Sequence, residues 1–266
     1  MECVRRVGLL IIGTVFWVHL ASGSLAAQTD CVESNSPIES ALPANVTEPQ
    51  LVQKFAAAED KVKQARAPYT VTRDVMIQTL NDSTPDGQWH EVAQISFDAR
   101  GKPAENVTYS EVSTLRGIQL SEADKDDIRT FMPWIFTSDQ VPEYKISYSG
   151  QQHVDDLDTY VFHVDPAKLE KNKRYFQGKI WIDSRDLQMV KLCGKSAELM
   201  HVKKHQSAEV RPTFVGYRQL VDGVWFPAYA RVDDTLHFGV QSVHVREVVR
   251  FKNYRRTGGT VTSAKP

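Results

Sequence analysis

Apolar and polar residues alternate with a period of two along most of the chain after residue 68, a pattern typical of β-strands that bury one face. About ten strands are predicted on this basis, and because most connections between them are short, neighbouring strands are expected to pair antiparallel. The predicted strands are Tyr69–Thr79, Trp89–Phe97, Val107–Val112, Tyr144–Ser149, Thr159–Val164, Phe176–Ile182, Leu187–Cys193, Phe214–Leu220, Trp225–Val232 and Ser242–Phe251.

Two segments depart from this alternation and are predicted to be helical. In Glu48–Ala65 apolar residues recur every three or four positions, Thr47 can cap the helix, and Pro49 suits its first turn. Ser121–Arg129 begins with a capping sequence and lies between the third and fourth strands. Each helix is too short to be stable alone, so we expect both to cover an open side of one large curved sheet or barrel, as a helical lid.

The two ends of the chain show neither pattern. In residues 1–27, Arg5 and Arg6 precede the apolar run Val7–Leu20 and small residues follow it, as in a signal peptide. The apolar run is too short to read as a spanning helix, so we expect an exported protein that is not an integral membrane protein. Residues 28–47 are predicted to be a flexible arm, residues 48–256 a single domain and residues 257–266 a loose tail.

The net charge limits the partners that the protein could bind, and the cysteines raise the question of a disulfide. Without residues 1–27 the formal net charge is about −2, which points to neither a nucleic-acid partner nor a strongly charged substrate. Two cysteines then remain, Cys31 and Cys193. In an oxidising compartment they could form one disulfide between the arm and a strand; the alternative is two unpaired thiols, with Cys193 buried as a small apolar side chain.

Two polar clusters have the residue types of reactive sites. Asp183, Ser184 and Asp186 lie at the most polar point between two predicted strands, where Asp and Ser side chains usually bond their own backbone, so we interpret them as a hairpin turn. His201 and His205 have the i,i+4 spacing of metal ligands, but no glutamate follows His201 as in a metalloprotease motif. We therefore predict no catalytic residue, no metal site and no cofactor, and a protein that is not an enzyme.

The helical insertion continues into the densest aromatic cluster of the chain, and this cluster is a candidate ligand site. Its members are Phe131, Met132, Trp134, Ile135 and Phe136, with Pro133 as a helix breaker among them. Aromatic and methionine side chains line apolar ligand sites, whereas the alternative is that the same residues are ordinary core.

Three strand residues complete the candidate site. Arg73 falls on the apolar face of its strand, where it would contact a buried partner or a ligand unless a bulge turns it to solvent. Ile180 and Ile182 are apolar residues of the strand before the Asp183 turn and are candidates to line a cavity. The strands flanking that turn have apolar residues on both faces, as expected of a sheet covered on more than one side.

The second half of the chain carries a family resemblance. A strand ending in Gly150 is followed by one ending in Val164-Asp165-Pro166, and Gly178–Asp183 leads a hairpin; VDGVWFPAYARV, from Val221 to Val232, is a weaker match of the same kind. Together with the signal peptide, the N-terminal helix and the helical insertion, this order resembles the LolA/LolB-like periplasmic lipoprotein carriers and their outer-membrane lipoprotein-sorting relatives.

The resemblance implies a fold and a function. The fold would be mainly β, a half-open β-barrel whose lining holds acyl chains beneath the helical lid. The function would be that of a periplasmic carrier or binding protein for lipid or for the acyl chains of lipoproteins, in outer-membrane lipoprotein sorting, with the ligand displacing the lid at Phe131–Phe136. The alternative is an envelope regulatory or assembly module of the same fold that binds a protein partner.

Overall fold

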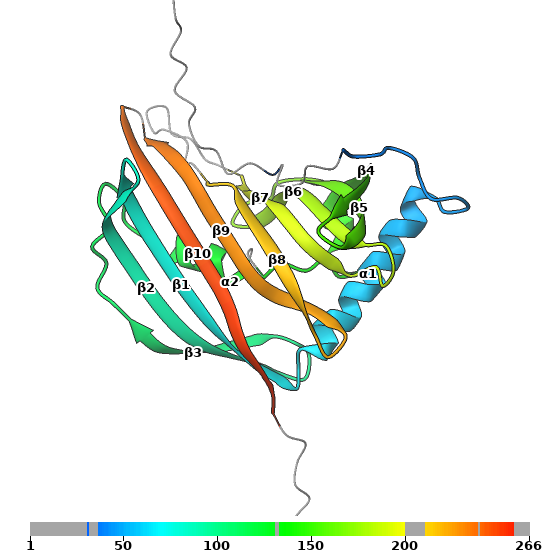
Figure 1. Ribbon diagram of the computed structural model, residues 1–266, viewed down its shortest axis with the longest axis horizontal. Coiled ribbons are helices and arrows are strands. Elements are labelled where there is room, and N and C mark those ends of the chain that lie inside the picture. Colours follow the sequence, from blue (N-terminus) through cyan, green and yellow to red (C-terminus); the bar gives the residue numbers. More distant parts are fainter. Residues whose placement is uncertain (1–30, 32–36, 131–132, 200–210, 239, 258–266) are drawn as a thin grey trace, which may run out of the picture.

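The computed structural model describes residues 31, 37–130, 133–199, 211–238 and 240–257, and this part of the chain is mainly β (Figure 1). Ten strands form one antiparallel sheet. They are β1 (Tyr69–Asn81), β2 (Thr84–Phe97), β3 (Pro103–Ser110), β4 (Tyr144–Val154), β5 (Leu157–Pro166), β6 (Arg174–Asp183), β7 (Met189–Glu198), β8 (Phe214–Val221), β9 (Val224–Phe238) and β10 (Gln241–Arg256). The described helices are α1 (Glu48–Ala65), α2 (Glu122–Thr130) and the 3-10 helix η1 (Val141–Glu143).

The order of the strands leaves the sheet open. It runs β3-β2-β1-β10-β9-β8-β7-β6-β5-β4, so the first strand pairs with the last, and β3 and β4 form the two edges. These edge strands are consecutive in the chain, and residues 111–143 therefore cross from one edge to the other. The predicted half-open barrel, with about ten strands, an N-terminal helix and a helical insertion, is confirmed.

Helix α1 has the bounds that the sequence predicts because its start is determined locally. The Gln50 N–H donates a hydrogen bond to Thr47 Oγ1, and the Thr47 N–H donates one to the Gln50 side chain. This reciprocal capping satisfies two N–H groups that the first turn leaves unpaired. The apolar stripe of the helix, which includes Leu51, Phe55 and Val62, is buried.

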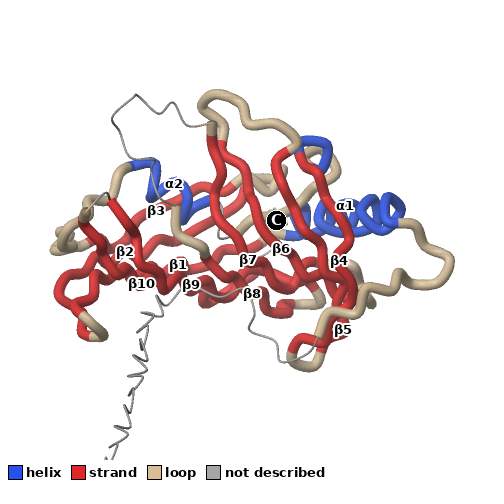
Figure 2. The backbone as a smooth tube through the Cα atoms, turned by 90° about the horizontal axis from the view of Figure 1, so that it is seen from above, coloured by secondary structure: helices blue, strands red, loops and turns tan. Residues whose placement is uncertain are grey.

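Both α-helices lie over the inner face of the curved sheet (Figure 2). Phe55 of α1 packs on Phe162 of β5 with ring centroids 5.2 Å apart. Ile128 of α2 is buried in the same hydrophobic cluster, which also contains Ile180 and Ile182 of β6. One core therefore connects the two helices to the sheet, and the segment that carries α2 is held over its inner face.

Several predicted strand bounds differ from those of the structure, and two of the differences involve a proline or a glycine. The third strand was predicted at Val107–Val112 but runs from Pro103 to Ser110, and proline is tolerated at the first position of an edge strand. Gly150 was predicted to end a strand but lies inside β4, at a shift in the β4–β5 register. A Cβ atom at Gly150 would lie 2.5 Å from the Glu39 carbonyl oxygen, so glycine permits a close approach of the chain there.

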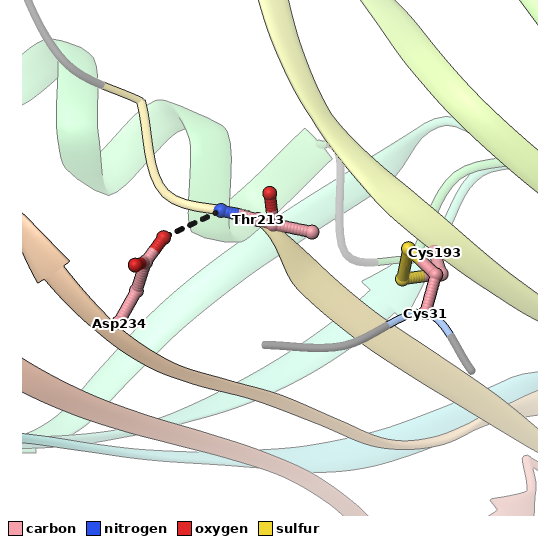
Figure 3. Close-up of a disulfide and its surroundings, with 4 residues drawn as sticks. All are labelled: Cys31, Cys193, Thr213 and Asp234. Carbon is pink, nitrogen blue, oxygen red and sulfur yellow. Dashed lines mark hydrogen bonds between the residues drawn. A yellow bond between two sulfur atoms is a disulfide. The ribbon is translucent and has the colours of Figure 1, made fainter. Parts of the chain in front are cut away.

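The segment before α1 is attached to the sheet at two places. Cys31 and Cys193 form a disulfide between residues separated by 162 positions (Figure 3). Glu39 pairs with Gln151 of β4, and the Ala41 carbonyl oxygen accepts hydrogen bonds from the Tyr148 hydroxyl and the Gln151 side chain. Residues 39–41 thus lie along the β4 edge of the sheet, and Cys31 is bonded to the interior strand β7. The proposed signal peptide and the last nine positions of the predicted tail lie outside the described residues.

Candidate ligand-binding site

Two cavities lie at the inner face of the sheet, where residues 111–143 cross it. The basic cavity, of about 460 Å³, is lined by Lys63, Arg66, Val71, Arg73, Ile95, Phe97, Arg100, Gly101, Lys102, Pro103, Glu105, Arg129, Thr130, Pro133, Trp134, Ile135, Gln140, Phe226, Pro227, Phe251 and Tyr254. The acidic cavity, of about 330 Å³, is lined by Ile77, Gly117, Ile118, Gln119, Leu120, Asp124, Asp127, Ile128, Ser196, Arg211, Pro212, Phe214, Val232, Leu236, Phe238, Val245 and Glu247. Strands β1 and β10 and helix α2 contribute to both.

Arg73 faces the basic cavity. Only 2% of the residue is exposed, so no bulge turns it to solvent. Its Nη1 and Nη2 atoms donate to the two carboxylate oxygens of Glu105 at 2.6 and 2.9 Å, and Nη2 also contacts Glu91 at 3.2 Å. Arg129 of α2 reaches the same Glu105 carboxylate at 3.3 Å. The edge strand β3, which carries Glu105, is thereby tied to β1 and to α2.

The basic cavity has an excess of positive charge. Among the described residues its lining has one carboxylate, Glu105, against the basic side chains of Lys63, Arg66, Arg73, Arg100, Lys102 and Arg129. Glu105 already contacts Arg73 and Arg129. Burial and the neighbouring Arg218 lower the pKa of Arg66 to about 10, which leaves this guanidinium charged at neutral pH. An apolar ligand with an anionic group fits such a surface.

The predicted aromatic cluster divides between cavity and core. Trp134 and Ile135 line the basic cavity. Phe136 is fully buried, with its ring centroid 5.3 Å from that of Tyr144, and lines neither cavity. The other two members, Phe131 and Met132, lie outside the described residues.

The two isoleucines predicted as lining residues also belong to the core. Ile180 and Ile182 are fully buried on β6, and neither contributes to a cavity. The strands that contribute most to the two cavities are instead β1, β9 and β10, which lie near the middle of the strand order. Strand periodicity predicts which face of the sheet a residue lies on. It does not predict which part of that face residues 111–143 leave uncovered.

A buried ion pair fixes the wall of the basic cavity. Arg218 of β8 donates two hydrogen bonds of 2.8 Å to the Glu59 carboxylate of α1, and its Nη2 donates to the Trp134 carbonyl oxygen at 2.8 Å. Arg66, which directly follows α1, donates to the neighbouring Pro133 carbonyl oxygen at 3.3 Å. Glu59 also accepts a hydrogen bond from the Met189 N–H at 3.0 Å. We call these contacts the Glu59–Arg218 clamp.

The clamp has a second attachment further along the insertion. Asp60 of α1 accepts hydrogen bonds from the Ser138 N–H at 3.0 Å and from its hydroxyl at 2.6 Å. Residues 133–138 are therefore held by α1 at both ends, with the buried Phe136 between the attachments. Pro133, Trp134 and Ile135 thus form part of the wall of the basic cavity.

Carboxylates dominate the polar side of the acidic cavity. Arg211 donates to Asp124 of α2 at 2.6 Å and to Glu198 of β7 at 3.0 Å. Arg174 of β6 pairs with Asp127 of α2 and also bonds the Ala123 carbonyl oxygen. Burial raises the pKa of Asp127 even though both arginines lower it.

The loop before β8 positions Arg211. The N–H of Thr213 donates to the Asp234 carboxylate of β9 at 3.4 Å, as Figure 3 shows. Two residues earlier, the Arg211 guanidinium meets the acids of α2 and β7. The network therefore joins the insertion to strands β6, β7 and β9 around the mouth of the acidic cavity.

Sequence reasoning missed the acidic cavity, although one signal was present. In β10, Val243, Val245, Glu247, Val249 and Phe251 all fall on one face by period two, and all are buried. A glutamate that shares one strand face with four apolar residues is predicted to be a buried carboxyl in apolar surroundings. The remaining lining comes from segments that are distant in the sequence.

The Asp183 turn singled out from the sequence is not part of either cavity. The Asp183 and Asp186 carboxylates accept hydrogen bonds from the N–H groups of Arg185 and Gln188, at 3.0 and 2.9 Å, as in a turn that bonds its own backbone. His201 and His205 lie outside the described residues. Within the described ranges, no group of three or more His, Cys, Asp or Glu side chains is arranged to hold a metal ion.

The fold and the cavities define a class of protein: a half-open β-barrel with ligand-sized cavities between its sheet and a helical insertion. No helix in the described part of the chain is long and apolar enough to span a membrane. The sequence matches no family model and no curated protein.

Solved structures with similar folds were found. A DUF1329 family protein from Desulfovibrio piger is 14% identical, with a TM-score of 0.44, over 79% of this chain and 93% of that chain. A LolA superfamily protein from Nitrosomonas europaea is 12% identical, with a TM-score of 0.36, over 79% and 94% of the two chains. An outer membrane lipoprotein-sorting protein domain from Vibrio parahaemolyticus is 11% identical, with a TM-score of 0.37, over 77% and 92%.

Proposed function

We propose that this protein is a periplasmic, non-enzymatic binding protein that shelters lipid, or the acyl chains of a lipoprotein, in the half-open barrel. The observation that carries the proposal is the pair of cavities, of about 460 and 330 Å³, beneath the insertion. Ligand pockets in proteins have volumes of roughly 300–1,000 Å³ and a mostly apolar lining with a few polar groups. The LolA-like resemblance of the sequence supports an acylated ligand.

The proposed ligand enters beside the insertion. The Glu59–Arg218 clamp and Phe136 hold residues 133–138 in place, so displacement of the whole Phe131–Phe136 segment would break buried contacts. Filling the cavities needs no such loss. Each large apolar side chain that the ligand removes from water contributes roughly 1.5–3 kcal/mol, which is enough for stable binding when several are covered.

Tryptophan fluorescence tests this proposal. Trp134 lines the basic cavity, and the emission of the purified protein should shift when a phospholipid or an acylated peptide is added. In the control variant Trp134→Phe the shift should be strongly reduced, because none of the other described tryptophans, Trp89, Trp181 and Trp225, lines either cavity. Native mass spectrometry should detect copurified lipid. Absence of both the shift and any copurified lipid would refute the proposal.

A second function, binding of a protein partner, is favoured by the edge strand β3. All its residues are exposed, and Val107 and Tyr109 are 45% and 49% exposed. An edge strand has unpaired N–H and C=O groups that can pair with a strand of another protein. Pulldown from envelope extract, with and without detergent, should then capture a partner that the double variant Val107→Lys/Tyr109→Lys loses. Capture that survives these substitutions would exclude β3 as the binding edge.

A further inference from the structure

The acidic cavity contains a buried carboxyl group that lacks a hydrogen-bond partner. Glu247 of β10 lies between Ile77 of β1 and Val232 of β9 in the register of the sheet, and only 7% of the residue is exposed. Its Oε1 atom forms no hydrogen bond with any described residue. An unpaired polar group at a buried position is costly, so such a group indicates a ligand or a function.

No cation neutralises Glu247 within the described chain. Arg211, which lines this cavity, and the nearby Arg174 are engaged by Asp124, Asp127 and Glu198. Ser196 of β7 donates its hydroxyl to Asp127 as well. The described lining of the cavity therefore has more carboxyl groups than basic groups, and an anionic ligand group would meet an excess of negative charge from these residues.

The protonation state of Glu247 follows from this environment. Burial, together with Asp127 and Asp124 of α2, raises the pKa of Glu247 to about 8. The carboxyl is therefore mostly neutral at pH 7, and a neutral carboxyl has one O–H donor. The remaining lining of the cavity is largely apolar, including Val245, Leu236 and Phe238.

We propose that the acidic cavity binds the uncharged carbonyl group of an acyl ester or amide, with the Glu247 carboxyl as the hydrogen-bond donor and the acyl chain against the apolar lining. This proposal deepens the proposed function and rests on it. It assigns an uncharged polar group to the acidic cavity, whereas the excess of basic side chains in the basic cavity suits an anionic group.

The proposal fixes the class of ligand by two features. A carbonyl oxygen accepts the one hydrogen bond that Glu247 offers, and it brings no charge to the acids of α2. A free carboxylate or phosphate group would instead be repelled by Asp124 and Asp127. A plain alkane would fill the cavity but leave the carboxyl unpaired.

Titration of the full-length protein with matched probes tests the proposal. The probes are a long-chain fatty acid methyl ester, such as methyl palmitate, and the alkane of similar length, and the readout is fluorescence or calorimetry at pH 6.5. The variant Glu247→Gln keeps an N–H donor, and Glu247→Leu removes it in a similar volume. Loss of one hydrogen bond should weaken ester binding about tenfold in Glu247→Leu, whereas alkane binding should not weaken.

The pH profile provides a second readout. Between pH 6.5 and 9.5 ester binding by the wild-type protein should weaken several-fold as the donor is lost, while ester binding by Glu247→Gln should stay constant. Thermal unfolding verifies that each variant is folded.

The outcomes separate the two proposals. Equal ester affinity in the wild type and a folded Glu247→Leu, with no pH dependence, would overturn the role of Glu247 and leave lipid binding intact. If neither ester nor alkane binds to the wild type, this proposal and the proposed function both fail.

Discussion

Removal of the Glu59 carboxylate should strongly destabilise the protein and loosen the wall of the basic cavity. In Glu59→Ala, the Arg218 guanidinium loses both 2.8 Å bonds to the carboxylate, and the Met189 N–H loses its acceptor. The Arg218 and Glu59 side chains are only 2% and 0% exposed, so water cannot replace the lost carboxylate. Arg218 would retain the Trp134 and Trp225 carbonyl oxygens as its acceptors.

The magnitude follows from the cost of a buried unpaired charge. Breaking a buried ion pair by removing one partner costs roughly 3–5 kcal/mol. In a domain of about this size each kcal/mol lowers Tm by about 2–4 °C, so Glu59→Ala should lower Tm by about 6–20 °C. In Glu59→Met/Arg218→Met both charges of this ion pair are removed together. The remaining loss should then be roughly 1–3 kcal/mol, since the Trp134 carbonyl oxygen still loses a donor.

Urea unfolding followed by circular dichroism measures the loss of stability in Glu59→Ala and in the double variant, as parts of a double-mutant cycle. The single variants should each be less stable than the double variant, which gives a coupling free energy of several kcal/mol between the two side chains. A loss below about 1 kcal/mol in Glu59→Ala, the range of an exposed ion pair, would refute the buried clamp. An Asp60→Asn control should change stability less, because Asp60 bonds Ser138 at an exposed site.

Two further predictions concern stability. Because the pKa of Glu247 is raised from 4.5 to about 8 by folding, its contribution should be most favourable below pH 4.5 and decrease up to pH 8, by at most about 5 kcal/mol. Glu247→Gln should abolish that part of the pH dependence in urea midpoints, and parallel curves for the two proteins would contradict it. Replacing Cys31 and Cys193 by alanine opens a loop of 162 positions and should reduce the free energy of unfolding by up to about 5 kcal/mol. An unchanged free energy under oxidising conditions would show that the arm adds no constraint.

Helix α1 illustrates what the sequence determines locally. Thr47, Gln50 and Pro49 define its start, and its bounds agree with the prediction at both ends. The number and antiparallel pairing of the strands were likewise predictable from alternation and short connections. The sequence does not determine which face of the sheet Arg73 occupies, because a single bulge in its strand would reverse the direction of the side chain. In the structure the β1–β2 register runs without a shift from Thr70 to Thr79, and the Arg73 side chain faces inward.

The cavities could not be predicted in the same way. Their walls combine β1, β9 and β10 with the insertion, and only the crossing path of residues 111–143 decides which inner-face residues stay uncovered. Ile180 and Phe136 were reasonable candidates by pattern but are fully buried in the core. Glu247 was visible as a glutamate among valines, yet its lack of a partner depends on the ion pairs that occupy Arg211.

Photo-crosslinking with an acyl ester that carries a diazirine near the middle of its chain tests most directly whether a ligand occupies the barrel. We expect labelled peptides to contain inner-face residues of β1 and β10, such as Val71, Ile77, Val245 and Phe251, which line the two cavities. An excess of unlabelled ester should compete this labelling away. Labelling that is absent, or confined to exposed residues of other strands and unaffected by the competitor, would contradict binding within the half-open barrel.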